Sequence, residues 1–285
     1  MTELSTWQQA LDYTFQTRHS WRHGNGAKTA RINCNHFTRL RGSSFPIRSI
    51  TQPTISQVCI ELEDEGKSDA TINRIISAVS TVLNHLAFDG LIHSAPKFRR
   101  RKEDECRKTW FTKEQVEQLA YCSMDPFERR DLADIIVTAA YTGMRQGELL
   151  KLAAKDIDLG LRVIHVGGRP DVKTKAANYR TIPIHDRIYS TITSRAEAHG
   201  NTRIFGSEWN DKDQLLRAFK KVRKYVGIDE DHVFHSLRHS FGTWCAEAGV
   251  PMLTIKDMMG HKRIETTLIY SKVTDKARDE AISMI

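Results

Sequence analysis

The sequence predicts a mainly α-helical protein of two domains, with a small β-sheet confined to the second. Apolar residues recur at helical spacing through most of the chain, and only 162–166 and 180–184 have β character. A polar, basic stretch without apolar periodicity separates the two parts. The 285 residues suffice for two domains that each bury a core. We therefore expect a helical domain at 1–93, a linker at 94–108 and a second domain at 109–285.

The first domain is predicted to be a small bundle of helices. Thr6–Phe15 is expected to form the first helix, and apolar residues within 22–48 indicate another. Thr54–Gln57 reads as a capping box, in which side chains satisfy free backbone N–H groups at the start of a helix. The clearest helix begins near Ser68. It carries a stripe at helical spacing, formed by Ile72, Ile75, Ile76, Val79, Val82, Leu83 and Leu86.

The second domain is predicted to combine helices with a hairpin. Thr112–Gln115 is another capping box, and a helical stripe that includes Leu132 and Ile136 follows it. The two β segments, 162–166 and 180–184, flank a polar loop that could close a hairpin. The chain after residue 185 is expected to be helical, with breaks near Gly200, Gly227, Gly249 and Gly260.

The charge of the chain is unevenly distributed. The formal net charge is +8, and residues 1–102 carry 14 Lys and Arg against 8 Asp and Glu. A basic balance favours a polyanionic partner such as nucleic acid. The basic run in 94–108 fits either a solvated linker or a strap that touches phosphates.

Several other classes of protein are disfavoured. The five cysteines are scattered and contain no CxxC pair, which argues against a disulfide framework or a structural zinc site. No apolar run approaches the roughly 18 residues of a membrane helix, and the N-terminus lacks a secretory signal. We expect a reduced, cytoplasmic protein without a cofactor.

Two segments of the second domain place basic residues where they could meet a phosphate. Arg145 follows the helix-breaking Gly143, with Glu148 three residues on. An arginine at the N-terminus of a new helix adds its guanidinium to free backbone N–H groups, which suits an anion. Taken alone, this stretch favours an Arg145–Glu148 surface pair instead. Lys173 and Lys175 lie in the loop between the two β segments.

Two further segments hold histidines and a tyrosine. His235, Arg238 and His239 stand at i, i+3 and i+4 and share one helical face. Two histidines four residues apart could bind zinc, but Ser236 stands where a zinc protease motif has Glu. His261 follows Gly260, and Tyr270 comes nine residues later. Taken alone, Tyr270 is typical of a packed core residue.

The ordered combination of these residues is far more specific than any of them alone. TGMRQGELLKL, KTKAANYRTIPI, HSLRHSFGTWCAEAGV and MMGHKRIETTLIYSKV resemble the motifs of the tyrosine recombinase (phage integrase) family. The resemblance covers roughly 110–275. Residues 70–79 are similar to the family's helical core-binding domain, much less specifically.

The resemblance implies a site that holds a DNA phosphate. Arg145 and Arg238 match the two arginines of the family, and His261 matches the histidine that hydrogen-bonds the same phosphate. Fixed cations stabilise a transition state whose phosphate oxygens carry extra charge. Glu148 and His239 are expected to support these groups, orienting the arginine and packing the helix.

The resemblance also implies how protons move. Tyr270 matches the nucleophile, and His235 occupies the position of its base. Lys173 is the expected general acid for the departing 5′ oxygen, with Lys175 as the alternative. No metal is expected, because the cations already surround the phosphate. A metal-nuclease interpretation of Asp171-Val-Lys173 lacks an upstream acidic partner.

Double-stranded DNA is the expected partner, gripped between the two domains. An apolar helical stripe follows Tyr270, formed by Ala277, Ala281, Ile282 and Ile285. The resemblance implies that this stripe docks on a neighbouring protomer. That exchange would build a homotetramer on two DNA duplexes. The alternative is a helix that packs on its own domain.

The resemblance thus implies a site-specific DNA recombinase that works through a 3′-phosphotyrosine intermediate. An integrase of a phage or other mobile element is the first hypothesis, and a resolvase of chromosome or plasmid dimers is the alternative. A type IB topoisomerase would use a similar site. A DNA-binding regulator of the same fold without catalysis is a further candidate, which the intact set of Arg, Lys, His and Tyr disfavours.

Overall fold

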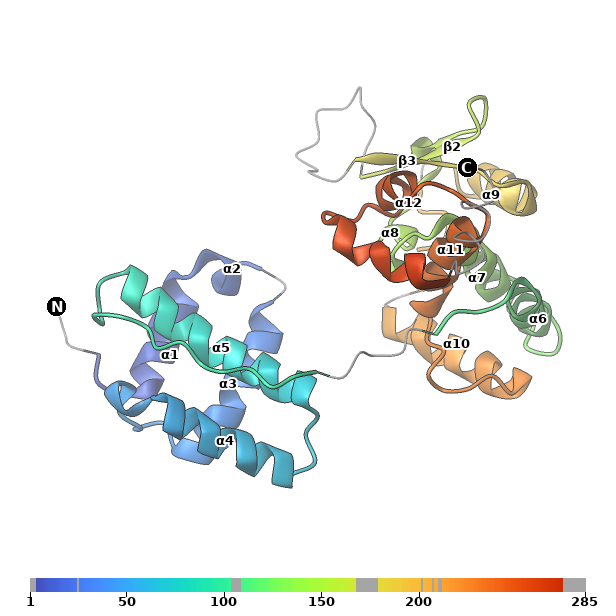
Figure 1. The fold of residues 1–285 in the computed structure, drawn as a ribbon. Coiled ribbons are helices and arrows are strands. Elements are labelled where there is room, and N and C mark those ends of the chain that lie inside the picture. Colours follow the sequence, from blue (N-terminus) through green and yellow to red (C-terminus); the bar gives the residue numbers. More distant parts are fainter. Residues whose placement is uncertain are drawn as a thin grey trace, which may run out of the picture. The chain divides into compact units, whose positions relative to one another are not determined.

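Helices form most of the chain, and one three-stranded sheet lies in its second part, which confirms the predicted fold class (Figure 1). The computed structural model describes residues 4–24, 26–103, 109–167, 179–200, 202–206, 208–209 and 212–273. The chain divides into two units, Met1–Cys106 and Arg107–Ile285. Among the described residues, no helix has the length and apolar character needed to span a bilayer.

The first unit is helical throughout its regular structure. Thr6 caps the first helix through a capping box with Gln9, and the Ser68 hydroxyl accepts from the backbone N–H of Thr71 at the start of α5. The elements are α1 (Trp7–Thr17), α2 (His19–Arg22), α3 (Ala27–Arg41), the 3-10 turn η1 (Ile47–Ser49), α4 (Gln52–Asp64) and α5 (Asp69–Phe88).

The predicted start of α4 is wrong, because the helix begins before Thr54. The helix begins at Gln52, with Thr51 as its N-cap, so Thr54 lies inside the first turn. Pro53 explains the earlier start, because proline fixes φ near the helical value and has no N–H to leave unpaired there. The Thr54 hydroxyl instead donates to the Ser49 carbonyl at 2.6 Å.

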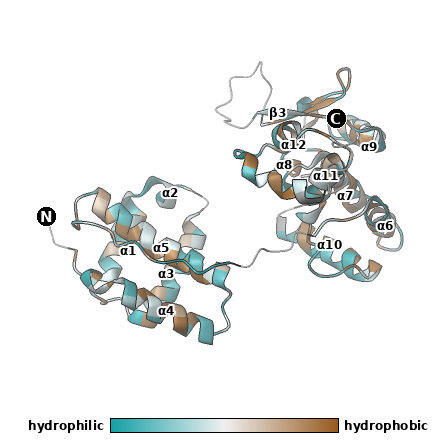
Figure 2. Cartoon of the chain, viewed as in Figure 1, coloured by the Kyte–Doolittle hydropathy of each residue, from teal (hydrophilic) through white to brown (hydrophobic). Residues whose placement is uncertain are grey.

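The core of the first unit forms around α5. Its apolar stripe is buried as the spacing predicts, and it packs with Trp7 and Phe37, which are fully buried. The rings of Trp7 and Phe37 meet edge to face, with centroids 4.8 Å apart. In Figure 2, brown apolar turns alternate with teal polar ones along these helices.

The described part of the expected linker is attached to the first unit. The Arg101 guanidinium pairs with Glu63 at 2.7 Å and with Asp69 at 3.0 Å. The buried Asn73 side chain bonds both the N–H and the carbonyl of Arg101. Residues up to 103 therefore lie against α4 and α5, and 104–108 lie outside the described residues.

The second unit carries the sheet and the remaining helices. Thr112 and Gln115 form the predicted capping box at the start of α6. The elements are α6 (Lys113–Met124), α7 (Arg130–Thr142), α8 (Gln146–Leu149), η2 (Ala154–Asp156), β1 (Ile157–Asp158), β2 (Val163–Val166), β3 (Arg180–Pro183), α9 (Asp186–His199), α10 (Lys212–Val226), α11 (Ser236–Glu247), α12 (Met252–Met259), η3 (Ile264–Thr266) and η4 (Leu268–Val273).

The sheet is antiparallel in the order β1-β2-β3. Ile164 on the central strand faces Ile157 on one side and Ile182 on the other, and all three are buried. The β2–β3 pairing confirms the predicted hairpin. Strand β1 was not predicted, because two residues are too few for an alternating pattern. The helical breaks expected after residue 185 are all present.

A single apolar core joins the helices of the second unit to the sheet. It includes Phe111, Ile136, Leu149, Ile164 and Phe219, each at most 2% exposed. A smaller cluster lies between α11, α12 and η4, formed by Phe241, Ala246, Ile255, Met259 and Tyr270. These two clusters position the ends of α7, α8, α11 and α12, where the functional residues lie.

Candidate active site

Arg145 lies in the short connection between α7 and α8. Helix α7 ends at Gly143, whose φ of 61° is left-handed, and Arg145 is the N-cap of α8. A Cβ on Gly143 would lie 2.5 Å from the Phe241 ring, so glycine is required for both conformation and space. The Arg145 side chain is 44% exposed, and its Nη2 donates to the Gly260 carbonyl at 3.1 Å.

Glu148 is shared by two arginines. It accepts from the Arg145 backbone N–H at 2.8 Å and from Arg145 Nη1 at 3.1 Å. Arg180, at the start of β3, donates to both of its carboxylate oxygens, at 3.1 and 2.7 Å. Burial acts to raise the pKa of Glu148, but the hydrogen bonds and charges of these arginines outweigh it and hold that pKa below its usual value.

Arg238 is buried at the centre of the site. It is 4% exposed, and it donates to the carbonyls of Gly143 (2.5 Å) and Met259 (2.6 Å). Burial, together with the charges of Arg145 and Arg180, lowers the pKa of Arg238 to about 10. The guanidinium therefore remains charged at neutral pH and is held by neutral acceptors.

His261 follows the end of α12. The helix ends at Gly260, whose φ of 66° is left-handed, and the His261 backbone N–H bonds the Lys256 carbonyl at 3.0 Å. The imidazole is 9% exposed, and its Nδ1 lies 2.8 Å from the Thr267 hydroxyl. His261 is thereby fixed beside the carbonyls that hold Arg145 and Arg238.

Tyr270 lies in η4 and is only 3% exposed. Its hydroxyl is 2.9 Å from Nδ1 of His239. Its ring lies against α11, close to Gly242. Burial raises the pKa of Tyr270 to about 12, and the nearby charge of Arg238 opposes that rise.

The two histidines of α11 have different positions. His239, expected to be a supporting residue, is the one at hydrogen-bond distance from the Tyr270 hydroxyl. His235 is the exposed N-cap of the helix, and its ring meets that of His239 edge to face at 5.1 Å. Sequence reasoning put both on one face but had no means to tell which reaches the tyrosine.

The structure brings together the predicted Arg145, Glu148, Arg238, His261 and Tyr270 from four separate segments. Lys173 and Lys175, the candidate general acids, lie outside the described residues. The described residues contain no group of three or more His, Cys, Asp and Glu side chains arranged to hold a metal ion.

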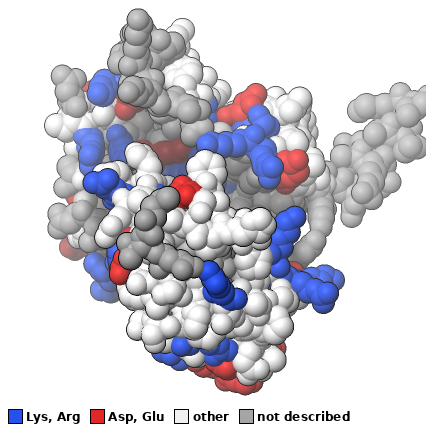
Figure 3. All heavy atoms as spheres, turned by 90° about the vertical axis from the view of Figure 1, so that its left-hand side faces the viewer, with Lys and Arg blue, Asp and Glu red and all other residues white. Residues whose placement is uncertain are grey.

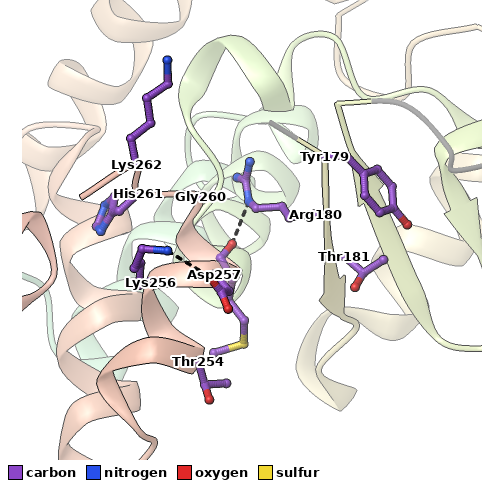
Figure 4. A pocket seen from close by; sticks show the side chains of 10 residues that line it. Tyr179, Arg180, Thr181, Thr254, Lys256, Asp257, Gly260, His261 and Lys262 are labelled. Atoms are coloured by element: carbon purple, nitrogen blue, oxygen red, sulfur yellow. Dashed lines mark hydrogen bonds and ion pairs between the residues drawn. The ribbon is translucent and has the colours of Figure 1, made fainter. Parts of the chain in front are cut away.

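A pocket of about 480 Å³ opens beside these residues, between the start of β3 and the end of α12 (Figure 4). Arg180, Lys256, His261 and Lys262 contribute the basic part of its lining. Sequence reasoning missed Arg180. A lone arginine at the start of a strand gives no signal, and its importance depends on contacts with residues 32 and 78 positions away.

Comparison with known proteins agrees with this arrangement. Residues 109–277 match the phage integrase family. The chain is 29% identical to the tyrosine recombinase XerD of Halalkalibacterium halodurans over 243 residues, which cover 80% of this chain and 79% of that protein. It is 28% identical to the integrase of Escherichia phage P2 over 238 residues, which cover 82% of this chain and 65% of the phage protein.

A solved structure shares the fold. The Tn1549 transposon integrase, in complex with transposon right end DNA, superposes with a TM-score of 0.77 over 98% of this chain and 99% of that one, at 20% identity. The family match extends over more than half of the sequence and includes every described residue of the site. The chain therefore belongs to the phage integrase family and is a tyrosine recombinase, an enzyme that cleaves and rejoins DNA.

Proposed function

We propose that this chain recombines double-stranded DNA at specific sites, with Tyr270 as the nucleophile. The Tyr270 oxygen forms a bond to phosphorus, the bond to the 5′ oxygen breaks, and a 3′-phosphotyrosine results. Attack by a second 5′ hydroxyl reverses the step. The observation that carries this proposal is the convergence of Arg145, Arg238 and His261 near Tyr270, from segments far apart in the sequence.

The two arginines are suited to the phosphate. Arg145 is held by two long contacts, from Nη2 to the Gly260 carbonyl and from Nη1 to Glu148, each at 3.1 Å, and its side chain is 44% exposed, so DNA can reach it. Arg238 is held by neutral carbonyls, so its charge is not cancelled by a direct carboxylate partner in the contacts described. Charge on the phosphate oxygens grows in the transition state, which these fixed cations stabilise selectively.

The proton of Tyr270 requires an acceptor, because a pKa of about 12 leaves the phenol neutral at physiological pH. The contact at 2.9 Å supports His239 as that acceptor. The family resemblance supports His235, and the two assignments predict different variants. Lys173 is the proposed general acid for the leaving 5′ oxygen, with Lys175 as the alternative.

The charge of the chain supports a grip on the DNA backbone. The net charge is +8, and basic side chains cover more of the face shown in Figure 3 than acidic ones. Neutralising phosphates releases counterions, so the affinity for a DNA site should fall steeply with salt. An affinity that barely changes between low and moderate salt would contradict this part of the proposal.

We further propose that the protein assembles as a tetramer on two duplexes through its last residues, 274–285, which lie outside the described residues. A variant that lacks them should bind a single duplex and melt at the wild-type temperature, yet fail to pair two duplexes. Loss of folding in the variant would instead indicate a helix that packs on its own domain.

Covalent capture tests the chemistry directly. Wild type and Tyr270→Phe are incubated with nicked duplexes tiled across the DNA that flanks the gene, and the products are resolved on a denaturing gel. We expect a shifted protein–DNA band for the wild type alone. Tight, salt-sensitive binding without any covalent band would overturn the proposed chemistry in favour of a DNA-binding regulator.

Integration into a second molecule is the proposed outcome, supported by the match to the phage integrase family and by the phage P2 relative. Resolution of chromosome or plasmid dimers is the alternative with the same chemistry. Plasmids with two captured sites distinguish them. Efficient joining of sites on separate molecules supports integration, and exclusive deletion between sites on one molecule supports resolution.

A further inference from the structure

Arg180 belongs to no group of residues considered so far for contact with the DNA phosphate. We infer that Arg180 is a positioning residue, which occupies the Glu148 carboxylate and thereby leaves the Arg145 guanidinium available to the phosphate. This inference rests on the proposed function, because it assigns Arg145 to a DNA phosphate. Arg145 then remains available to the phosphate although Glu148 lies beside it.

Each of the three nitrogens of the Arg180 guanidinium donates to a protein group. Nε donates to the Met258 carbonyl at 2.7 Å, and Nη1 and Nη2 donate to the two oxygens of Glu148 at 3.1 and 2.7 Å. The side chain is 5% exposed. Figure 4 shows it extending from β3 toward the end of α12. Such burial fits a residue that acts through its neighbours better than one that touches DNA.

Close packing fixes this position. A Cβ on Gly260 would lie 2.9 Å from Nη1 of Arg180, so the left-handed glycine that ends α12 also makes room for the guanidinium. Arg180 therefore joins three elements of the site. It is the first residue of β3, its guanidinium pairs with Glu148 of α8, and the same group donates to the Met258 carbonyl in the last turn of α12.

The contacts of Glu148 reveal a competition between two arginines. Arg180 takes both carboxylate oxygens, and its shorter bond measures 2.7 Å. Arg145 reaches the same carboxylate with one guanidinium nitrogen, at 3.1 Å. Without Arg180, both oxygens of the Glu148 carboxylate could accept hydrogen bonds from the Arg145 guanidinium. Such a bidentate pair is the strongest arrangement open to these two groups. Arg145 would then be turned away from the phosphate.

The charges around Glu148 also support a positioning role for Arg180. Arg145, Arg180 and Arg238 lie close enough for the first two to lower the pKa of the third, and Glu148 is the carboxylate that opposes them. A lysine at position 180 would supply the charge but not the planar fork that covers both oxygens. We therefore expect Arg180→Lys to restore only part of the function lost in Arg180→Met.

The first test measures covalent adduct formation on a nicked duplex. Arg180→Met should form adduct about 100-fold more slowly than wild type, with affinity for the duplex changed less than 2-fold. The decisive variant is Glu148→Gln/Arg180→Met, because removing the carboxylate charge should release Arg145 and recover at least 10-fold of the lost rate. A merely structural role predicts that the double variant is no faster than Arg180→Met.

The second test does not depend on cleavage. Phenylglyoxal modifies accessible arginines, and mass spectrometry reports the rate at Arg145. We expect modification to slow several-fold in Arg180→Met and to recover in the double variant. An unchanged rate at Arg145 would overturn the inference. A wild-type protein that forms no adduct would overturn the proposed function instead, and the modification rates would still decide the role of Arg180.

Discussion

Gly242 provides the sharpest test of how Tyr270 is held. It lies inside α11, and a Cβ built on it would be 2.5 Å from Cζ, 2.6 Å from Cε2 and 2.9 Å from Cδ2 of the Tyr270 ring. A Cβ in a folded protein essentially never lies within 3.0 Å of a non-bonded carbon. In Gly242→Ala, the Tyr270 ring is expected to move by about 1 Å, because non-bonded carbons are at their best separation at about 3.5–4.0 Å.

The size of the effect follows from three contributions. Forcing a methyl into a filled site costs about 1–3 kcal/mol. Loss of the hydrogen bond between Tyr270 and His239 costs about 1 kcal/mol. The better helix propensity of alanine returns about 1 kcal/mol. The net loss of about 1–3 kcal/mol corresponds to a melting temperature lower by roughly 2–10 °C for a domain of this size.

Cleavage should suffer more than stability. A displacement of about 1 Å in a reacting group costs on the order of 100-fold in rate. We therefore expect Gly242→Ala to form the covalent adduct about 100-fold more slowly, with DNA affinity unchanged. Gly147→Ala is the matched control, because a Cβ there meets nothing within 4 Å. A Gly242→Ala variant that cleaves as fast as wild type, or faster, would refute the reasoning.

Three further predictions concern charge and protons. The difference in phenolate absorbance between wild type and Tyr270→Phe should show one tyrosine with a pKa of about 12. The folded state holds this proton more tightly than the unfolded state does. The stability that the protonated Tyr270 contributes is therefore complete below about pH 10 and is lost as the pH rises toward 12. Glu148→Gln should lower the unfolding free energy by about 2 kcal/mol at neutral pH, and denaturant titrations should show the difference vanishing as the pH falls through the lowered pKa of Glu148. His239→Asn should slow adduct formation more than His235→Asn, because His239 lies 2.9 Å from the Tyr270 hydroxyl; the reverse order would assign the base to His235.

Much of the fold follows from local signals. The periodic stripe of α5 and the capping box at Thr112 depend only on residues within a few turns, and both are present in the structure. The errors have local causes too. Strand β1 has two residues, which is too short for a pattern, and its existence depends on pairing with β2.

The site was predictable as a set of residues but not as a set of contacts. Arg145, Arg238 and Tyr270 were identified by the resemblance of their motifs to the tyrosine recombinase family, and the structure brings them together. The contact between His239 and Tyr270 spans 31 residues. It depends on where η4 packs against α11, and spacing along one helix cannot determine that.

The ends of two helices explain how three arginines can lie close together. Arg238 donates to carbonyls at the C-terminal ends of α7 and α12, and Arg145 and Arg180 each donate to a carbonyl at the end of α12. The C-terminal end of a helix carries partial negative charge, so these carbonyls stabilise cations without neutralising them. Three guanidinium groups thus lie near one carboxylate, Glu148, which pairs directly with only two of them, so positive charge exceeds negative charge among these four side chains. Gly143 and Gly260 follow α7 and α12 in a left-handed conformation, and a Cβ on them would meet the Phe241 ring and the Arg180 guanidinium, so these two glycines help to place the carbonyls beside the arginines.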